Sequence, residues 1–306
     1  MKTLPLKSDP PNRVVRARAS PRPRDRPAPQ SGIRLEERDI SLLTDLFLWE
    51  VMLRGHLQTL FFGSVGRTNA RLRQLFDWQF VARTYLPIGP FGTDAGATAG
   101  CQAVYTLGKA GIPIVADRLG WDVAAVRERQ RRGTPTHLLH ALDGVAFRLA
   151  LEAACRKSEE ITQLHVLPEM LSRRSFDVRE NGGRWRAQVF KPDLVVVLAQ
   201  SAAPVGYAVE IDRGHTSQSE FAHKLRIHAA AMQGTRGSLF AGWHSCAPGG
   251  TLIITTSPSR RDNLRQLAFR EGREGCRFTT FGALYDEGAL QPIWHAPIDS
   301  MPVTLL

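Results

Sequence analysis

Three carboxylates stand beside two apolar runs in the second half of the chain. Asp193 precedes the run LVVVLA, and Glu210 and Asp212 end the run VGYAVEID. Both runs are rich in β-branched residues and have the length of strands, and the Ser-Ala-Ala-Pro between them is typical of a turn, so we expect an antiparallel hairpin. Side chains alternate along a strand, so Glu210 and Asp212 share a face. With a loop of residues 201–204, Asp193 would lie opposite Asp212 and diagonal to Glu210.

This acid cluster predicts a metal site. Carboxylates held together repel one another at neutral pH, and the first strand offers no positive partner except Lys191 at its start. A bound cation would relieve the repulsion, and oxygen ligands suit Mg²⁺ or Mn²⁺, which keep positions open for water and phosphate. The alternative is that the acids end the strands in solvent and only solubilise the edge of the sheet.

This region resembles the core of the PD-(D/E)XK nuclease superfamily, because a Pro-Asp dipeptide ending at Asp193 is followed by a strand, a turn and a second strand with Glu210. The resemblance implies that Asp193 and Glu210 hold the metal. Most members have a lysine two residues after the glutamate, where this chain has Asp212. Some members supply the lysine from the following helix, which makes Lys224 the candidate and leaves Asp212 to assist or orient. An additional acid is implied from the preceding segment, and the candidates are Glu159, Glu160 and Glu169.

The composition favours a polyanionic partner. The chain of 306 residues has a formal net charge of +11, and residues 1–32 alone hold eight Lys or Arg, two Asp and seven Pro. This segment is predicted to be a disordered basic arm, which either follows DNA phosphates or is an inert solvated leader. The four cysteines are far apart, and no apolar run approaches the length of a membrane span. These features indicate a cytoplasmic protein with no membrane contact and no zinc site.

Three short helices are predicted after this arm, in residues 35–51, 56–62 and 65–79, with Ser64 capping the third. The tight glycine turns between them are typical of a helix-turn-helix. On the third helix the apolar side chains form one stripe, and the opposite arc is suited to reading the major groove of DNA. The polar residues assigned to that arc are Arg67, Asn69, Arg71, Arg73 and Gln74.

Two strand-like segments, FVARTYLPI and QAVYTLGKAG, flank the glycine-rich stretch GPFGTDAGATAG, and we interpret them as a wing. Residues 33–118 are therefore predicted to form a winged helix that binds double-stranded DNA. The alternative is a winged helix that contacts only protein. Residues 119–136, which include the basic cluster RERQRR, are the expected linker.

Residues 137–306 are predicted to form a mixed α/β domain of the restriction-endonuclease-like type. A long amphipathic helix opens it, and His137 and His140 on that helix are interpreted as packing or surface residues. After the acidic hairpin, Ser217 and Glu220 form a capping box. The core stripe of the capped helix is expected to be Phe221, Leu225, Ala229 and Met232. TLIITTS, SRRDNLRQLAFREG and CRFTTFG then continue as strand, helix and strand.

The order of these features over residues 35–285 resembles the replication-relaxation family of bacterial mobile elements and plasmids. The stretch VEIDRG, which holds Glu210 and Asp212, carries the resemblance most specifically. The family implies DNA binding in the replication or relaxation of a plasmid. One hypothesis adds a metal-dependent endonuclease domain, and a second is a non-catalytic replication or transcription factor. A third is an assembly adaptor, with protein partners or a second copy of the chain.

Overall fold

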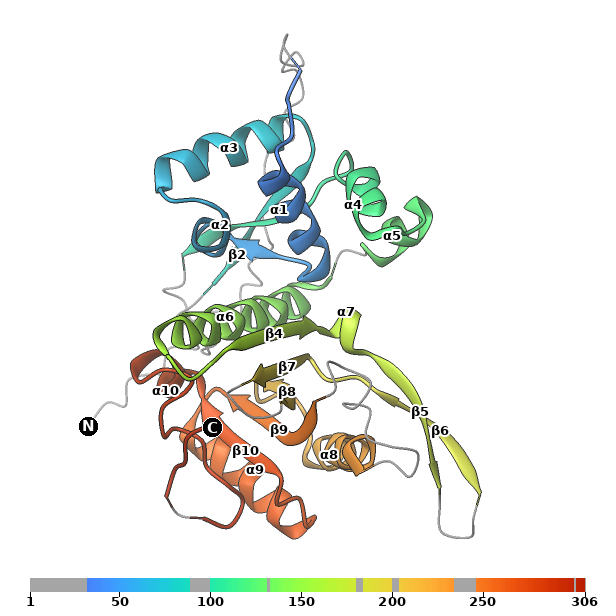
Figure 1. The fold of residues 1–306 in the computed structure, drawn as a ribbon, viewed down its shortest axis with the longest axis vertical. Coiled ribbons are helices and arrows are strands. Elements are labelled where there is room, and N and C mark those ends of the chain that lie inside the picture. The colour runs from blue at the N-terminus through green and yellow to red at the C-terminus, as the bar shows by residue number, and fades with distance from the viewer. Residues whose placement is uncertain are drawn as a thin grey trace, which may run out of the picture.

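The computed structural model describes residues 32–88, 100–130, 133–179, 184–199, 204–233, 246–299 and 301–305. Within these ranges the protein is a mixed α/β structure with three antiparallel or mixed sheets (Figure 1). The predicted basic arm, apart from its last residue, and the glycine-rich stretch at 89–99 lie outside the described residues. In the described part of the chain, no helix combines the length and apolar character needed to cross a bilayer.

The N-terminal elements confirm the three predicted helices and the two predicted strands, and they add one short strand, β1 (Met52–Leu53), that was not predicted. The predicted elements are α1 (Glu37–Leu48), α2 (Arg54–Phe61), α3 (Val65–Asp77), β2 (Val81–Pro87) and β3 (Cys101–Leu107). β3 lies between β1 and β2 and pairs antiparallel with both. As expected, the Ser64 side chain caps α3 by accepting a hydrogen bond from the backbone N–H of Arg67. Leucines at helical spacing on α1 and α3 are fully buried and hold the helices together.

Three helices connect this part to the large sheet. They are α4 (Ile112–Leu119), α5 (Val123–Arg129) and α6 (Pro135–Lys157). α5 lies inside the segment expected to be a linker. α6 begins after Thr134, whose side chain accepts a hydrogen bond from the N–H of His137, and it runs between the N-terminal sheet and the large sheet (Figure 1).

The large sheet has the strand order β10-β9-β8-β7-β4. Its strands are β4 (Gln163–Pro168), β7 (Leu194–Ala199), β8 (Val205–Asp212), β9 (Ala247–Thr255) and β10 (Cys276–Thr280). β7 pairs antiparallel with β4 and β8, whereas β8, β9 and β10 run parallel. The remaining elements are α7 (Glu169–Ser172), β5 (Arg174–Arg179), β6 (Trp185–Phe190), α8 (Gln218–Gln233), α9 (Pro258–Arg270) and α10 (Phe281–Asp286). The predicted strand, helix, strand order of β9, α9 and β10 is confirmed.

Helices cover both faces of this sheet. α6 packs on one face, where Val145 and Leu151 join a core with Val196 and Val209. α8 and α9 pack on the other face around Ile253. The alternation predicted for β8 is therefore confirmed, because Val209 faces α6, while the residues before and after it, Ala208 and Glu210, face α8.

The register of the acidic hairpin differs from the prediction. Leu194 pairs with Val209 and Leu198 with Val205, whereas a loop of residues 201–204 would pair Gln200 with Val205. This register places Asp193 opposite Glu210 and not opposite Asp212. The shift is two residues, so it leaves each side chain on its predicted face.

Candidate functional site

Asp193 lies at the start of β7 and is held by two donors. Its Oδ2 accepts a hydrogen bond of 2.7 Å from the backbone N–H of Ile211, and its Oδ1 lies 3.1 Å from Nε2 of His140 on α6. Burial raises the pKa of Asp193, but His140, the charge of Lys224 and the Ile211 N–H outweigh burial and lower the pKa to about 2. Burial in turn lowers the pKa of His140, yet the Asp193 carboxylate raises it overall. His140 is thus a partner of the candidate site and not only a packing residue.

Glu210, near the end of β8, is the most buried of the three acids of the hairpin, with 1% of its surface exposed. Its Oε2 accepts a hydrogen bond of 2.7 Å from Nζ of Lys224, which projects from the second turn of α8. Burial lowers the pKa of Lys224, but the charges of Glu210 and Asp193 raise it well above its ordinary value. The structure therefore brings together Asp193, Glu210 and Lys224, three of the four residues predicted for a catalytic site.

His228 is a neighbour of Glu210 that the sequence analysis missed. It is buried one turn after Lys224 on α8, and its Nε2 lies 3.1 Å from Oε1 of Glu210 without forming a hydrogen bond. Among the described residues, Glu210 Oε1 and His228 Nδ1 are buried atoms with no hydrogen-bond partner. A histidine four residues after the candidate lysine faces the same side of a helix, and that spacing was the available signal.

Asp212 is engaged by different residues. Its carboxylate accepts hydrogen bonds from Nε (2.7 Å) and Nη2 (3.1 Å) of Arg260 on α9 and from Oγ1 of Thr255 (3.1 Å). Arg260 Nη2 also donates to the backbone oxygen of Thr216. The hydrogen bond to Asp212 raises the pKa of Arg260. These contacts tie the start of α9 to the end of β8, so Asp212 has a structural partner for each carboxylate oxygen.

The three acids consequently do not form the unpaired cluster predicted from the sequence. Each one has a cationic or histidine partner that comes from a helix outside the hairpin. Within the described residues, no group of three or more His, Cys, Asp or Glu side chains is arranged to hold a metal ion. Any cation at this site would have to rely on two carboxylates together with water or substrate oxygens.

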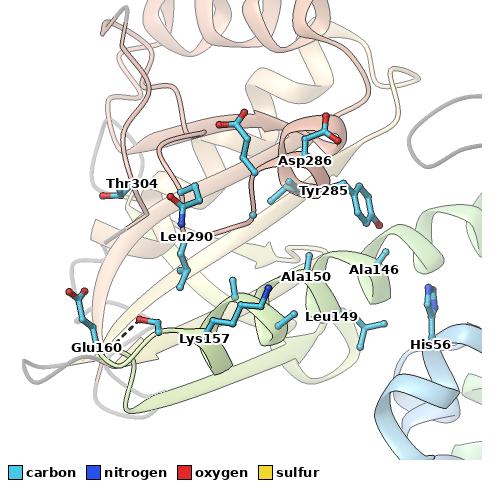
Figure 2. Close-up of a pocket in the computed structure, with 17 residues that line it drawn as sticks. His56, Ala146, Leu149, Ala150, Lys157, Glu160, Tyr285, Asp286, Leu290 and Thr304 are labelled. Atoms are coloured by element: carbon cyan, nitrogen blue, oxygen red, sulfur yellow. Dashed lines mark hydrogen bonds between the residues drawn. The ribbon is translucent and has the colours of Figure 1, made fainter. Parts of the chain in front are cut away.

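Of the three additional acids, Glu169 lies nearest to the site. The pairing of Pro168 with Leu194 brings Glu169 beside Asp193, where its Oε1 lies 3.1 Å from Nζ of Lys191. Glu160 instead precedes the opposite end of β4. It lines an open groove of about 920 Å³ between α6 and the C-terminal segment, together with Lys157, Tyr285 and Leu290 (Figure 2). This groove is separate from the Asp193–Glu210 site.

The predicted DNA-facing arc of α3 is present with one change. Four of its residues are exposed: Arg67, Asn69, Arg73 and Gln74. Arg71 turns inward, where Nε and Nη2 contact the two carboxylate oxygens of Asp39 at 3.1 and 2.5 Å. Its Nη1 also donates to Oε1 of Gln74 at 2.8 Å. Arg71 therefore joins α3 to α1 and orients Gln74, rather than contributing a free charge to the arc.

These features describe a mixed α/β protein that combines a small helical unit with an exposed basic helix and a sheet with a buried carboxylate pair. The sequence pattern of replication-relaxation proteins matches residues 43–238, and the chain belongs to the replication-relaxation family. No curated protein and no solved structure matches the chain.

Proposed function

We propose that this protein binds double-stranded DNA in the replication of a mobile element, through a winged helix formed by residues 33–118. Family membership supports the replication role. The observation that carries DNA binding is the exposed arc of α3. α3 follows α2 after a short turn, and a three-stranded antiparallel sheet accompanies the helices. This order of helices and strands is the one found in winged helices.

The chemistry of this arc suits the major groove. Arg67 and Arg73 supply guanidinium groups that pair with phosphates or with guanine, and Asn69 and Gln74 supply amides that pair with adenine. The side chain of Gln74 is held by Arg71, which reduces the conformational entropy lost on binding. The arc thus offers both positioning contacts and base-edge contacts.

Replacing Arg67 and Arg73 with alanine is expected to weaken DNA binding and to reduce the slope of log affinity against log salt by about two, because each phosphate contact contributes about one. Affinity for duplexes should be measured by fluorescence anisotropy at several salt concentrations. Arg226→Ala with Arg270→Ala removes the same charge from exposed positions on α8 and α9 and serves as the control. Equal binding by wild type and the α3 double variant would place the DNA surface elsewhere.

A second candidate function is metal-dependent DNA cleavage by a PD-(D/E)XK-type fold. The observation that favours it is the convergence of Asp193, Glu210 and Lys224 at adjacent strand ends and the following helix. The donor set fits Mg²⁺ or Mn²⁺, because such ions are held by one or two carboxylates plus water and phosphate oxygens. Oε1 of Glu210, which is buried and accepts no hydrogen bond from the described residues, is an oxygen suited to that role.

In this reading Asp193 and Glu210 would hold the ion, which supplies Lewis acidity and an activated water when bound. Lys224 would leave part of its contact with Glu210 and place its charge at the scissile phosphate. His140 keeps Asp193 ionised and fixed at the strand end. Asp212 orients the site only through the contact between β8 and α9.

Cleavage is expected to show as Mn²⁺-dependent nicking of supercoiled plasmid that chelator abolishes, and Asp193→Asn and Glu210→Gln should remove it while DNA binding persists. Millimolar Mg²⁺ or Mn²⁺ should also raise the melting temperature of the wild type, because an ion that binds only the native state stabilises it. The same rise should persist in Glu274→Gln, a change at an exposed acid. Intact plasmid and unchanged melting would favour the non-catalytic alternative.

A further inference from the structure

The two-stranded sheet formed by β5 and β6 projects from the body of the protein. Among the residues that the structure describes, β5 and β6 pair only with each other, and Figure 1 shows them extending away from the large sheet beside α8. In the sequence, the hairpin lies between α7 and β7. Its two strands therefore form an arm, which we call the β-ribbon and define as residues 173–179 and 184–190.

The base of the β-ribbon is fixed to the core. Phe190 is fully buried against Val195, Val197 and Ala208, and Phe176 packs on the same cluster. Phe176 pairs with Gln188 in the antiparallel register, so Phe176 and Phe190 lie on one face of the ribbon. Anchoring at this end gives the outer part a defined direction.

The outer part of the β-ribbon is basic and carries an exposed aromatic side chain. The exposed cationic residues of this part are Arg184 and Arg186, whereas Arg173 and Arg174 lie at the base, where Arg174 pairs with Phe190. Asp177 is the only acid among the described residues of the ribbon. Trp185 is 42% exposed and Val189 39% exposed, and both lie on the face opposite Phe190. The ribbon thus combines excess positive charge with an exposed indole.

We propose that the β-ribbon is a second DNA-binding element, which enters a groove of duplex DNA and places Arg184 and Arg186 on the phosphates and Trp185 against the sugars or base edges. The proposal rests on the proposed DNA binding. α3 and the β-ribbon lie at opposite ends of the molecule (Figure 1). The two elements therefore contact separate segments of DNA.

Charge and shape favour duplex DNA over other partners. The major groove of B-DNA admits a two-stranded β-ribbon, and arginines along the strands match the phosphates on either side. A protein strand added to the ribbon edge would meet the same arginines, which disfavour pairing between edges. The major groove of an RNA helix is too deep and narrow for a ribbon to read.

The test uses the full chain with Arg184→Ala and Arg186→Ala combined, and with Trp185→Ala alone. The double variant should lower the salt slope of duplex binding by about two. Both variants should shorten the hydroxyl-radical footprint at one end and leave the protection by α3 intact. The Arg226→Ala, Arg270→Ala protein should bind with the wild-type slope and footprint. Circular dichroism and melting should match the wild type for every variant, since the changed residues are exposed.

Each outcome bears on the β-ribbon separately from α3. If the Arg67→Ala, Arg73→Ala protein loses affinity while the ribbon variants bind as wild type does, the ribbon proposal is wrong and the proposed function stands. If wild type binds no DNA, both are wrong. If the ribbon changes reduce binding to double-stranded RNA and leave duplex DNA binding unchanged, the ribbon is an RNA contact and the proposal is overturned.

Discussion

Replacing Arg71 with alanine is expected to destabilise the protein by about 3–5 kcal/mol, the usual cost of leaving one member of a buried ion pair without its partner. Asp39 has 0% of its surface exposed, and Arg71 contacts both of its carboxylate oxygens. Arg71 also donates to the backbone oxygen of Arg34, so one side chain joins α3, α1 and the segment before α1. Asp39 would keep two weaker contacts, a hydrogen bond of 2.9 Å from the backbone N–H of Glu36 and the guanidinium of Arg38, whose Nη2 lies 3.5 Å from Oδ1.

The pH dependence of this effect follows from Asp39. Burial raises its pKa, but Arg71, the backbone N–H of Glu36 and the charge of Arg38 lower it overall. A lowered folded-state pKa gives stability that is present above about pH 4, the ordinary value, and is lost as the pH falls further. The difference between wild type and Arg71→Ala should therefore shrink below about pH 4.

Urea denaturation at a series of pH values measures this difference. Arg73→Ala changes an exposed arginine on the same helix and should alter stability by no more than about 0.5 kcal/mol. In contrast to its small effect on stability, Arg73→Ala should lower DNA affinity, and it should do so while the protein remains fully folded. A stable Arg71→Ala protein at pH 7 would show that the Asp39 pair contributes little to the fold.

Replacing Arg260 with alanine is expected to cost a similar amount, about 3–5 kcal/mol, because Asp212 is buried and, of its hydrogen-bond partners among the described residues, would keep only Thr255. If the loss comes from an unpaired charge, adding Asp212→Asn to the Arg260→Ala protein should restore part of the stability. Arg270→Ala, at an exposed position on the same helix, is the control.

This comparison also decides what Asp212 does. A structural Asp212 predicts that Asp212→Asn lowers the melting temperature and reduces plasmid nicking only as far as folding is lost. A catalytic Asp212 predicts loss of nicking with unchanged stability. Melting and nicking should be measured on the same preparations, so that the two readouts refer to the same folded fraction.

The predicted elements were found where local pattern decides the structure. Apolar spacing and the Ser64 cap predict α3, and β-branched runs predict the pairing of β7 with β8. The predicted register of β7 with β8 was wrong, because the composition of the turn does not determine at which residues the pairing of the two strands ends. β4 and the β-ribbon were not predicted, since their strands mix polar and apolar residues and depend on neighbouring strands for their form.

The contacts of individual side chains could not be predicted from helical spacing. Spacing placed Arg71 on the outer arc, yet a buried acid on another helix draws it inward. The α8 stripe was expected to include Ala229 and Met232. Met232 packs, partly buried, against the core, but the fully buried residues of that part of the helix are His228 and Ala231. Arg71 and His228 each contact an acid on another element, Asp39 and Glu210. A helical pattern of apolar residues does not show such polar contacts between separate elements.

α6 limits where the chain can be divided. Its first half packs Leu142 against Val51, Leu86 and Val104 of the N-terminal unit, and its second half covers the large sheet. A fragment that ends before α6 would expose the underside of the small sheet to water, and a fragment that begins with α6 would carry that same apolar stripe uncovered. α6 contributes side chains to both hydrophobic cores. If the N-terminal unit or the large-sheet unit is exchanged between relatives, the new unit therefore has to fit the surface that α6 presents to it.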